Sequence, residues 1–137
     1  MKKVIATIMA ISLLVAFSEF ANARVKYISK SELMQQADLV VSGKVTKLEQ
    51  TDQIKKLRMG GGLSGKITNA TIQIEKVIKG NTDNQYVIVE FIGIIEGLEP
   101  DVQDAQFGMG SKGTAYLKKL SSGHYEALGG WINGWVL

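Results

Sequence analysis

The sequence predicts an all-β fold that carries one or two short helices. The first observation is the stretch Lys66–Gly80, where Ala70, Ile72, Ile74 and Ile78 alternate with other residues. Successive side chains of a strand point to opposite faces, so this period of two is typical of a strand with one buried face. The second observation is that shorter alternating stretches recur on both sides of it, separated by polar and glycine-containing turns.

Residues 1–23 are predicted to be a secretory signal peptide. A basic start is followed by an apolar run, and Ala21 and Ala23 put small residues at the two positions that a signal peptidase reads. Cleavage is expected between Ala23 and Arg24, so the chain is predicted to be exported, either to a periplasm or as a secreted protein. A membrane anchor is the alternative, but Glu19 interrupts the apolar run before about 20 residues, the length that a spanning helix needs.

Residues 24–137 are predicted to form a single domain, and no membrane span is expected after cleavage. The chain has no Cys, which excludes disulfides, a thiol nucleophile and a cysteine-ligated metal. The domain must therefore be held by its hydrophobic core alone. A net charge of +3 at pH 7 is too mild to indicate a particular partner.

The first expected element is a short helix within Val25–Gln36. Ser29 and Glu32 have the spacing of a capping box, in which each side chain satisfies a backbone N–H group of the first turn. Leu33 and Ala37 lie four residues apart and are expected to face the core. A helix of about two turns must be docked against the rest of the domain to persist.

The first three strands are expected over Asp38–Gln50, Lys66–Gly80 and Gln85–Ile95. Gly43 lies inside the first strand, which is typical of a bulge or a sharp bend. Residues 51–65 are predicted to be a long loop, and loops of this length are often functional or disordered. The third strand is apolar on both faces, so it is expected to be covered on both sides.

The last part of the chain is expected to hold a short helix and three more strands. Pro100–Phe107 is predicted to be the helix, since proline suits the first helical position and acidic residues suit a helix start. Strands are expected over Thr114–Leu120 and His124–Leu128, with a hairpin turn at residues 121–123. Trp131–Leu137 is expected to be a final edge strand.

This order of elements predicts the architecture. Five strands with a helix between the third and the fourth is the order of the OB-fold. The fold class is therefore a five- to six-stranded antiparallel OB-like barrel with one or two short helices. A small β-sandwich is the alternative, because the same strand pattern also builds that fold.

Three stretches also carry a resemblance to a known family. They are ADLVVSGKV at residues 37–45, ATI at 70–72 running on to VIKG at 77–80, and GTAYL at 113–117. Together they resemble small exported bacterial domains of the OB-fold type found in tissue inhibitors of metalloproteinases and netrin modules. The resemblance implies the fold, and it implies no assigned activity. Those inhibitors begin with a cysteine that chelates zinc, whereas this chain has none, so neither zinc chelation nor a catalytic residue carries over.

One glycine-rich stretch has part of the spacing of a phosphate-binding loop. Gly60, Gly65 and Lys66 match the pattern G-x-x-x-x-G-K. Ile67 stands where a Ser or Thr hydroxyl must reach Mg²⁺, and a strand is expected where the mechanism needs a helix. A flexible glycine loop is therefore the preferred interpretation.

Basic residues gather around the same stretch, which raises the question of polyanion binding. The first loop of an OB-fold often helps to bind oligonucleotides, and aromatic residues on the second and third strands then stack on the bases. Tyr86 and Phe91 are the only candidates for stacking, and export argues against nucleic acid as the natural target. A solvated basic loop is the preferred interpretation of this group: Lys44, Lys47, Lys55, Lys56, Arg58 and Lys66.

Other candidate residues are better explained by structural roles. His124 is the single histidine, so a Ser–His–Asp triad would have to use it. The two tryptophans, Trp131 and Trp135, suit either core closure or partner binding. Four acidic residues lack the spacing of an EF-hand calcium loop and are attributed to a helix start; they are Glu96, Glu99, Asp101 and Asp104.

The sequence therefore predicts an exported, non-enzymatic binding domain without cofactor or metal. A protein or peptide partner is favoured. Oligonucleotide or polyanion binding through residues 51–66 is the first alternative, and an unrecognised hydrolase that uses His124 is the second. The residues expected to contact a partner are Lys55, Lys56, Arg58, Tyr86, Trp131 and Trp135.

Overall fold

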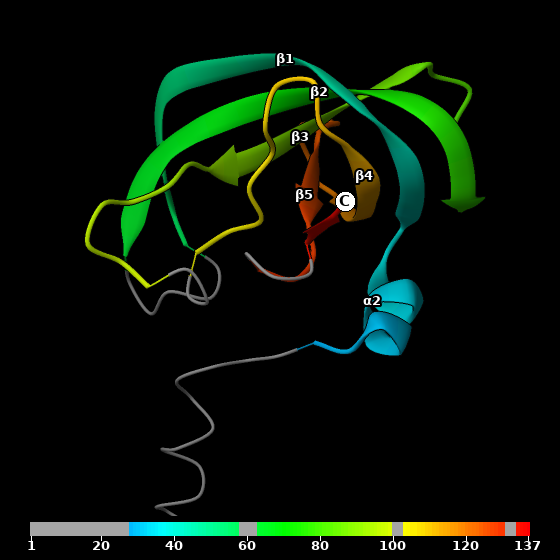
Figure 1. The fold of residues 1–137 in the computed structure, drawn as a ribbon, viewed down its shortest axis with the longest axis horizontal. Coiled ribbons are helices and arrows are strands. Elements are labelled where there is room, and N and C mark those ends of the chain that lie inside the picture. The colour runs from blue at the N-terminus through cyan, green and yellow to red at the C-terminus, as the bar shows by residue number, and fades with distance from the viewer. Residues whose placement is uncertain (1–27, 58–62, 100–102, 131–133) are drawn as a thin grey trace, which may run out of the picture.

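The computed structural model describes residues 28–57, 63–99, 103–130 and 134–137. Within them, one helix and six strands follow one another along the chain (Figure 1). The signal peptide expected over residues 1–23 lies outside the described residues. None of the helices in the described ranges is long and apolar enough to cross a membrane. The elements are α2 (Lys30–Gln36), β1 (Leu39–Lys56), β2 (Ser64–Lys79), β3 (Tyr86–Ile92), β4 (Lys112–Lys119), β5 (Tyr125–Ala127) and β6 (Trp135–Val136).

Five of the strands form a closed ring of pairings. Its order is β1-β2-β3-β5-β4, and β4 pairs back onto β1 to close it, while β6 pairs with β4. The expectation that all strands run antiparallel is wrong for one pair, because β3 and β5 are parallel. Strand direction cannot alternate all the way around a ring with an odd number of members, so one neighbouring pair must be parallel.

The β1–β2 hairpin is longer than the sequence predicts. β1 continues to Lys56 and β2 begins at Ser64, so the long loop expected over residues 51–65 is largely strand. Ile54 pairs with Lys66 and Lys56 with Ser64, and these ladder positions explain why a polar stretch stays extended. The register shifts between Ser42 and Gly43, which confirms the expected irregularity at that glycine.

The core fills the interior of the ring. Ala70 and Ile72 of β2 are buried there as predicted, but Ile78 is 45% exposed because β2 extends past the core. The ring of Phe107 packs at a tilt against the rings of Phe91 and Trp135, with 5.1 Å between ring centroids in both pairs. The other buried members of this cluster are Leu39, Val41, Val45, Val87, Val89, Ala105, Ala115, Leu117 and Ala127.

Helix α2 packs on the outside of the ring, and the Ser29 half of the expected capping box forms at its start. The Ser29 hydroxyl accepts a hydrogen bond from the backbone N–H of Glu32 at 3.3 Å. Leu33 and Ala37 are both buried, as expected from their spacing. They form a second apolar cluster with Val40, Tyr116 and Leu128.

The helix expected over Pro100–Phe107 is absent from its described part, residues 103–107. This segment instead crosses beside the end of β3, and Asp104 forms an isolated bridge with Gly130. Its polar side chains bind backbone groups: the Asp104 carboxylate accepts from the N–H of Ile92 at 3.0 Å, and Gln103 accepts from the N–H of Ile95 at 3.0 Å. These bonds favour an extended course over a helix, and residues 100–102 lie outside the described ranges.

Candidate functional site

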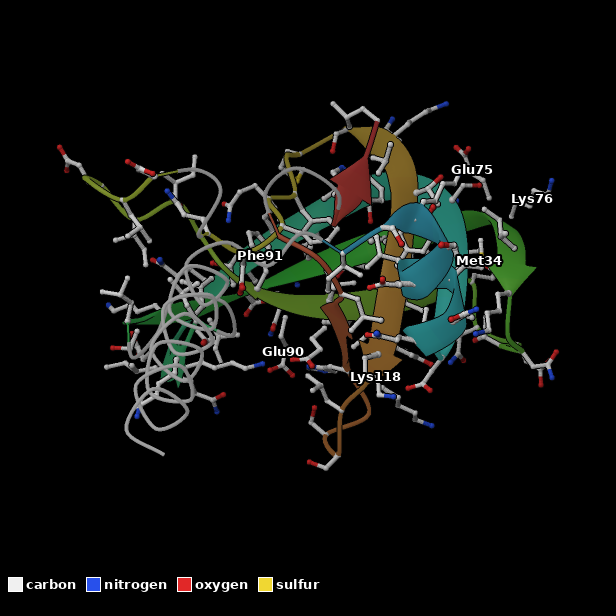
Figure 2. The ribbon with its side chains drawn as sticks, turned by 90° about the horizontal axis from the view of Figure 1, so that it is seen from below. Met34, Glu75, Lys76, Glu90, Phe91 and Lys118 are labelled. Carbon is white, nitrogen blue, oxygen red and sulfur yellow. The ribbon has the colours of Figure 1, made fainter. Side chains whose placement is uncertain are left out.

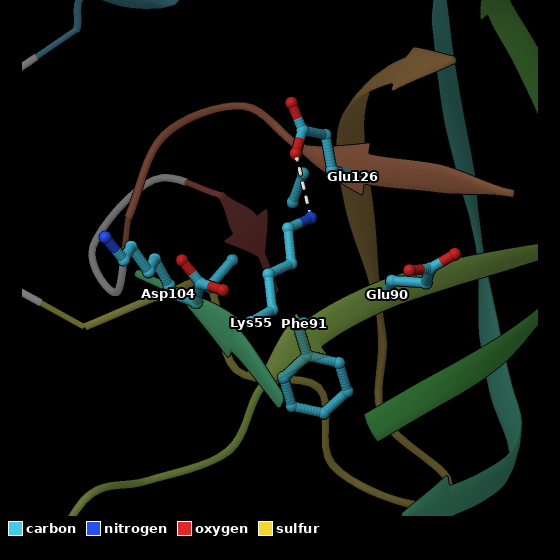
Figure 3. Close-up of a pocket in the computed structure, with 8 residues that line it drawn as sticks. Lys55, Glu90, Phe91, Asp104 and Glu126 are labelled. Atoms are coloured by element: carbon cyan, nitrogen blue, oxygen red, sulfur yellow. Dashed lines mark hydrogen bonds and ion pairs between the residues drawn. The ribbon is translucent and has the colours of Figure 1, made fainter. Parts of the chain in front are cut away.

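The end of the β1–β2 hairpin folds back against β5. The ammonium group of Lys55 lies 3.3 Å from a carboxylate oxygen of Glu126, and this ion pair joins the two elements (Figure 3). The hairpin encloses a cavity of about 10 Å³, which is room for roughly one water. The space is therefore too small for an organic ligand. It is lined by Lys55, Lys56, Glu90, Phe91, Asp104, Ala105, Glu126 and Ala127.

A polar group lies next to this ion pair, on the β3–β5 seam. Glu90 and Glu126 are partners in the parallel register, so their side chains leave the same face of the sheet. One oxygen of Glu90 lies 2.9 Å from Nδ1 of His124 and accepts a hydrogen bond from the Ser122 hydroxyl at 3.1 Å. Sequence reasoning missed both glutamates, because they belong to different strands and no local spacing connects them.

The arrangement around His124 differs from that of a hydrolase triad. In a triad the serine hydroxyl bonds the imidazole, and the imidazole is oriented by a carboxylate. Here Ser122 and His124 both bind the same Glu90 oxygen, and the backbone N–H of His124 donates to the Ser122 hydroxyl at 3.4 Å. The geometry ties the β4–β5 turn to β3, and it gives the hydrolase hypothesis no support.

The basic residues near the hairpin are largely offset by carboxylates. Besides Lys55 with Glu126, Lys47 lies 3.2 Å from Glu49 and Lys66 lies 3.9 Å from Asp52. Lys44 and Lys56 are exposed, and Arg58 lies outside the described residues. The described part of the hairpin is thus a surface of mixed charge rather than a cationic groove.

The aromatic residues expected at a contact surface do not meet at the hairpin. Trp135 is only 7% exposed and its indole N–H donates to the Ser111 hydroxyl at 3.1 Å, so it packs in the core, and its expected contact with a partner stays a prediction. Tyr86 is exposed, but it pairs with Gln73 at the opposite end of β3 from the hairpin end. Phe91 is buried, and Trp131 lies outside the described residues.

The structure also locates the glycine-rich motif and the group of acidic residues. Lys66 lies within β2, so a strand rather than a helix follows the glycine-rich stretch and no phosphate-binding loop can form in the usual way. Glu96 and Glu99 are exposed, and Asp101 lies outside the described residues. Across the part of the chain that the structure describes, no group of three or more His, Cys, Asp or Glu side chains is placed to hold a metal ion.

Two of the exposed apolar side chains of the described residues lie at the hairpin end, and others lie elsewhere on the surface. Ile54 is 72% exposed and Leu63 is 43% exposed. The register places Ile54 opposite Lys66, and the N–H of Leu57 donates to the carbonyl of Leu63, so both residues belong to the same end of the hairpin. We call Ile54, Lys56 and Leu63 the hairpin-end surface.

No protein-family model matches this chain, and neither the curated proteins nor the solved structures contain a match to it.

Proposed function

We propose that this chain is an exported, non-enzymatic binding domain that contacts a protein or peptide partner through the hairpin-end surface. The observation that carries the proposal is the exposure of Ile54 and Leu63 at the end of a hairpin. Exposed apolar side chains near the tip of a hairpin are accessible to a protein partner. The neighbouring lysine, Lys56, adds a polar rim of the kind that surrounds such contacts.

We further propose that the ring of strands is an OB-like barrel. Its five strands close in a ring, with β1 paired to both β2 and β4, and this supports the proposal. In OB-folds the loop between the first two strands contributes to ligand binding, and the hairpin end occupies that position in the chain. The absence of a helix over residues 103–107 is a departure from the expected pattern.

A protein partner is favoured over an oligonucleotide by charge and by aromatic placement. Three hairpin lysines already have carboxylate neighbours, which reduces the positive field that attracts a polyanion. Base stacking needs exposed aromatic rings beside the basic residues, whereas Phe91 is buried and Tyr86 lies at the far end of β3.

The test is site-specific photo-crosslinking in the cells that export the protein. A photoreactive residue replaces Ile54 in one variant and Val77 in a control, since Val77 is 38% exposed at the other end of β2. A discrete crosslinked protein is expected at position 54 and not at 77, and Leu63→Asp should abolish it. Equal crosslinking at both positions, or none at position 54, would contradict the proposal.

The polyanion alternative is tested with the purified protein and a single-stranded oligonucleotide. If that alternative holds, affinity falls steeply with salt and is lost in the combined variant Lys55→Ala/Lys56→Ala/Arg58→Ala, because phosphate binding releases counterions. Absent or salt-independent binding is the result that we expect.

A further inference from the structure

A second hollow lies away from the hairpin end, between α2, the C-terminal end of β2, β4 and β6. Its volume is about 260 Å³, far larger than the space beneath Lys55. Figure 2 shows Met34 between helix α2 and the end of β2, where it forms part of the wall. The residues that line this cavity are Lys30, Leu33, Met34, Ile78, Thr114, Tyr116 and Val136.

The walls of this cavity are mostly apolar and differ in exposure. Leu33 and Tyr116 are 1% and 4% exposed, so they form its floor. Ile78 and Val136 are 45% and 44% exposed, which places them at its mouth. Apolar side chains left open to water at the mouth of a cavity gain free energy when an apolar ligand covers them.

One cation stands at the rim of the cavity. Lys30 is exposed, and no carboxylate of the described residues lies within ion-pair distance of its ammonium group. Lys79 lies near the same helix but its ammonium group is already bound, because it donates to the carbonyls of Met34 and Gln35 at 2.6 and 3.1 Å. Lys30 is therefore the charged group that can meet a ligand here.

We propose that this cavity binds an aliphatic carboxylate of medium chain length. The chain lies against Met34, Ile78 and Val136, and the carboxylate pairs with the ammonium group of Lys30. At about 260 Å³ the cavity has room for several methylene groups, and octanoate serves as the test ligand. The proposal is independent of the partner contact at the hairpin end, because the two surfaces share no residue.

The proposal is tested by titrating the purified exported chain with octanoate at low ionic strength and recording backbone amide NMR shifts. Saturable binding is expected, with shifts confined to α2, the end of β2, β4 and β6. Each methylene added from hexanoate to octanoate should tighten binding about fourfold, because each one buries its own apolar surface. Octan-1-ol and octyltrimethylammonium should bind more weakly, because neither carries the negative charge.

Two variants distinguish octanoate binding in the cavity from binding elsewhere on the surface. Ile78→Asp should weaken octanoate binding more than about tenfold, since it puts a carboxylate beside the chain and removes apolar wall. Lys30→Gln should weaken it roughly threefold, as expected for an exposed ion pair. The matched control Ile54→Asp, at the hairpin end, should leave binding unchanged, and amide spectra of each variant show whether it is folded.

Three results with the unmutated chain would overturn the proposal. They are the absence of saturable octanoate binding, an affinity for octan-1-ol or octyltrimethylammonium equal to that for octanoate, and shifts spread evenly over the surface. An effect of Ile54→Asp as large as that of Ile78→Asp would also overturn it, because the ligand would then bind at no defined site.

Discussion

Gly43 shows how a single residue shapes the first strand. A Cβ atom placed on this glycine would overlap the backbone carbonyl oxygen of Gln73 and crowd the side chain of Ile72. Backbone atoms of a neighbouring strand cannot move aside without breaking the ladder around them. The bend at this position therefore depends on the absence of a side chain.

We expect Gly43→Ala to destabilise the protein by about 1–3 kcal/mol, the range found when extra atoms are forced into a packed interior. The measurement is the free energy of unfolding from urea denaturation. Gly93→Ala is the matched control, because the nearest atom to its added Cβ is the Thr68 hydroxyl oxygen at 3.9 Å. Equal unfolding free energies for the two variants would contradict the assignment of the close contact.

At the level of the element, α2 depends on groups outside its own turns. It has only 7 residues, too few for an isolated helix to be stable in water. Ser29 caps its first turn, and Lys79 of β2 donates to two carbonyls of its last turn. Basic groups near a helix C-terminus satisfy carbonyls that have no partner within the helix.

Lys79→Met should therefore loosen the last turn of α2 and destabilise the protein by about 1 kcal/mol, the usual net contribution of a hydrogen-bonded group. Amide hydrogen exchange should become faster in α2 and remain unchanged in β3. Lys76→Met is the control, since this exposed lysine of the same strand makes no such bond. If both variants behave alike, the tether between β2 and α2 is not a stabilising contact.

At the scale of the whole molecule, β1 is the strand that connects β2, β4 and β5. It has 18 residues and pairs with β4 near its start and with β2 along most of its length. Its last residues then reach β5 through Lys55 and Glu126. The hairpin end is thus attached to the opposite side of the ring by a partly buried ion pair.

A double-mutant cycle of Lys55→Met and Glu126→Gln should give a coupling free energy of about 0.5 kcal/mol that falls at high salt, as for other partly exposed pairs. The cycle isolates this pair even though Glu126 makes a further contact. Lys47 and Glu49 form the control cycle, and no measurable coupling is expected there, because both side chains are more than 60% exposed. A coupling free energy of zero for Lys55 and Glu126 would show that the hairpin end is not held by this pair.

The proposal that the chain is exported makes a separate prediction about the whole chain. Mass spectrometry of the exported protein should find Arg24 as its first residue. Ala23→Leu should block cleavage and leave the precursor in the cell, because the peptidase needs a small residue at that position. Mature protein that still begins at Met1 would show that the segment is not a signal peptide.

Local patterns predicted much of the fold but only part of the candidate site. The period of two identified β2, and the spacing of Ser29 and Glu32 identified the helix start, since both signals lie within a few residues. Lys55 was expected at a contact surface, which stays a prediction, and its ion pair with Glu126 was not expected. Nothing in the sequence around either residue indicates that the two will meet.

The sequence by itself determined where the middle of each longer strand lies, where α2 begins, and that no disulfide contributes. These properties follow from side-chain alternation, capping chemistry and composition, which are local. Tertiary structure alone decided that β1 runs past Gln50, that residues 103–107 cross the ring without forming a helix, and that Trp135 is buried. It also brought Glu90 beside Glu126, because hydrogen bonds and packing between distant segments outweigh local preference once the ring closes.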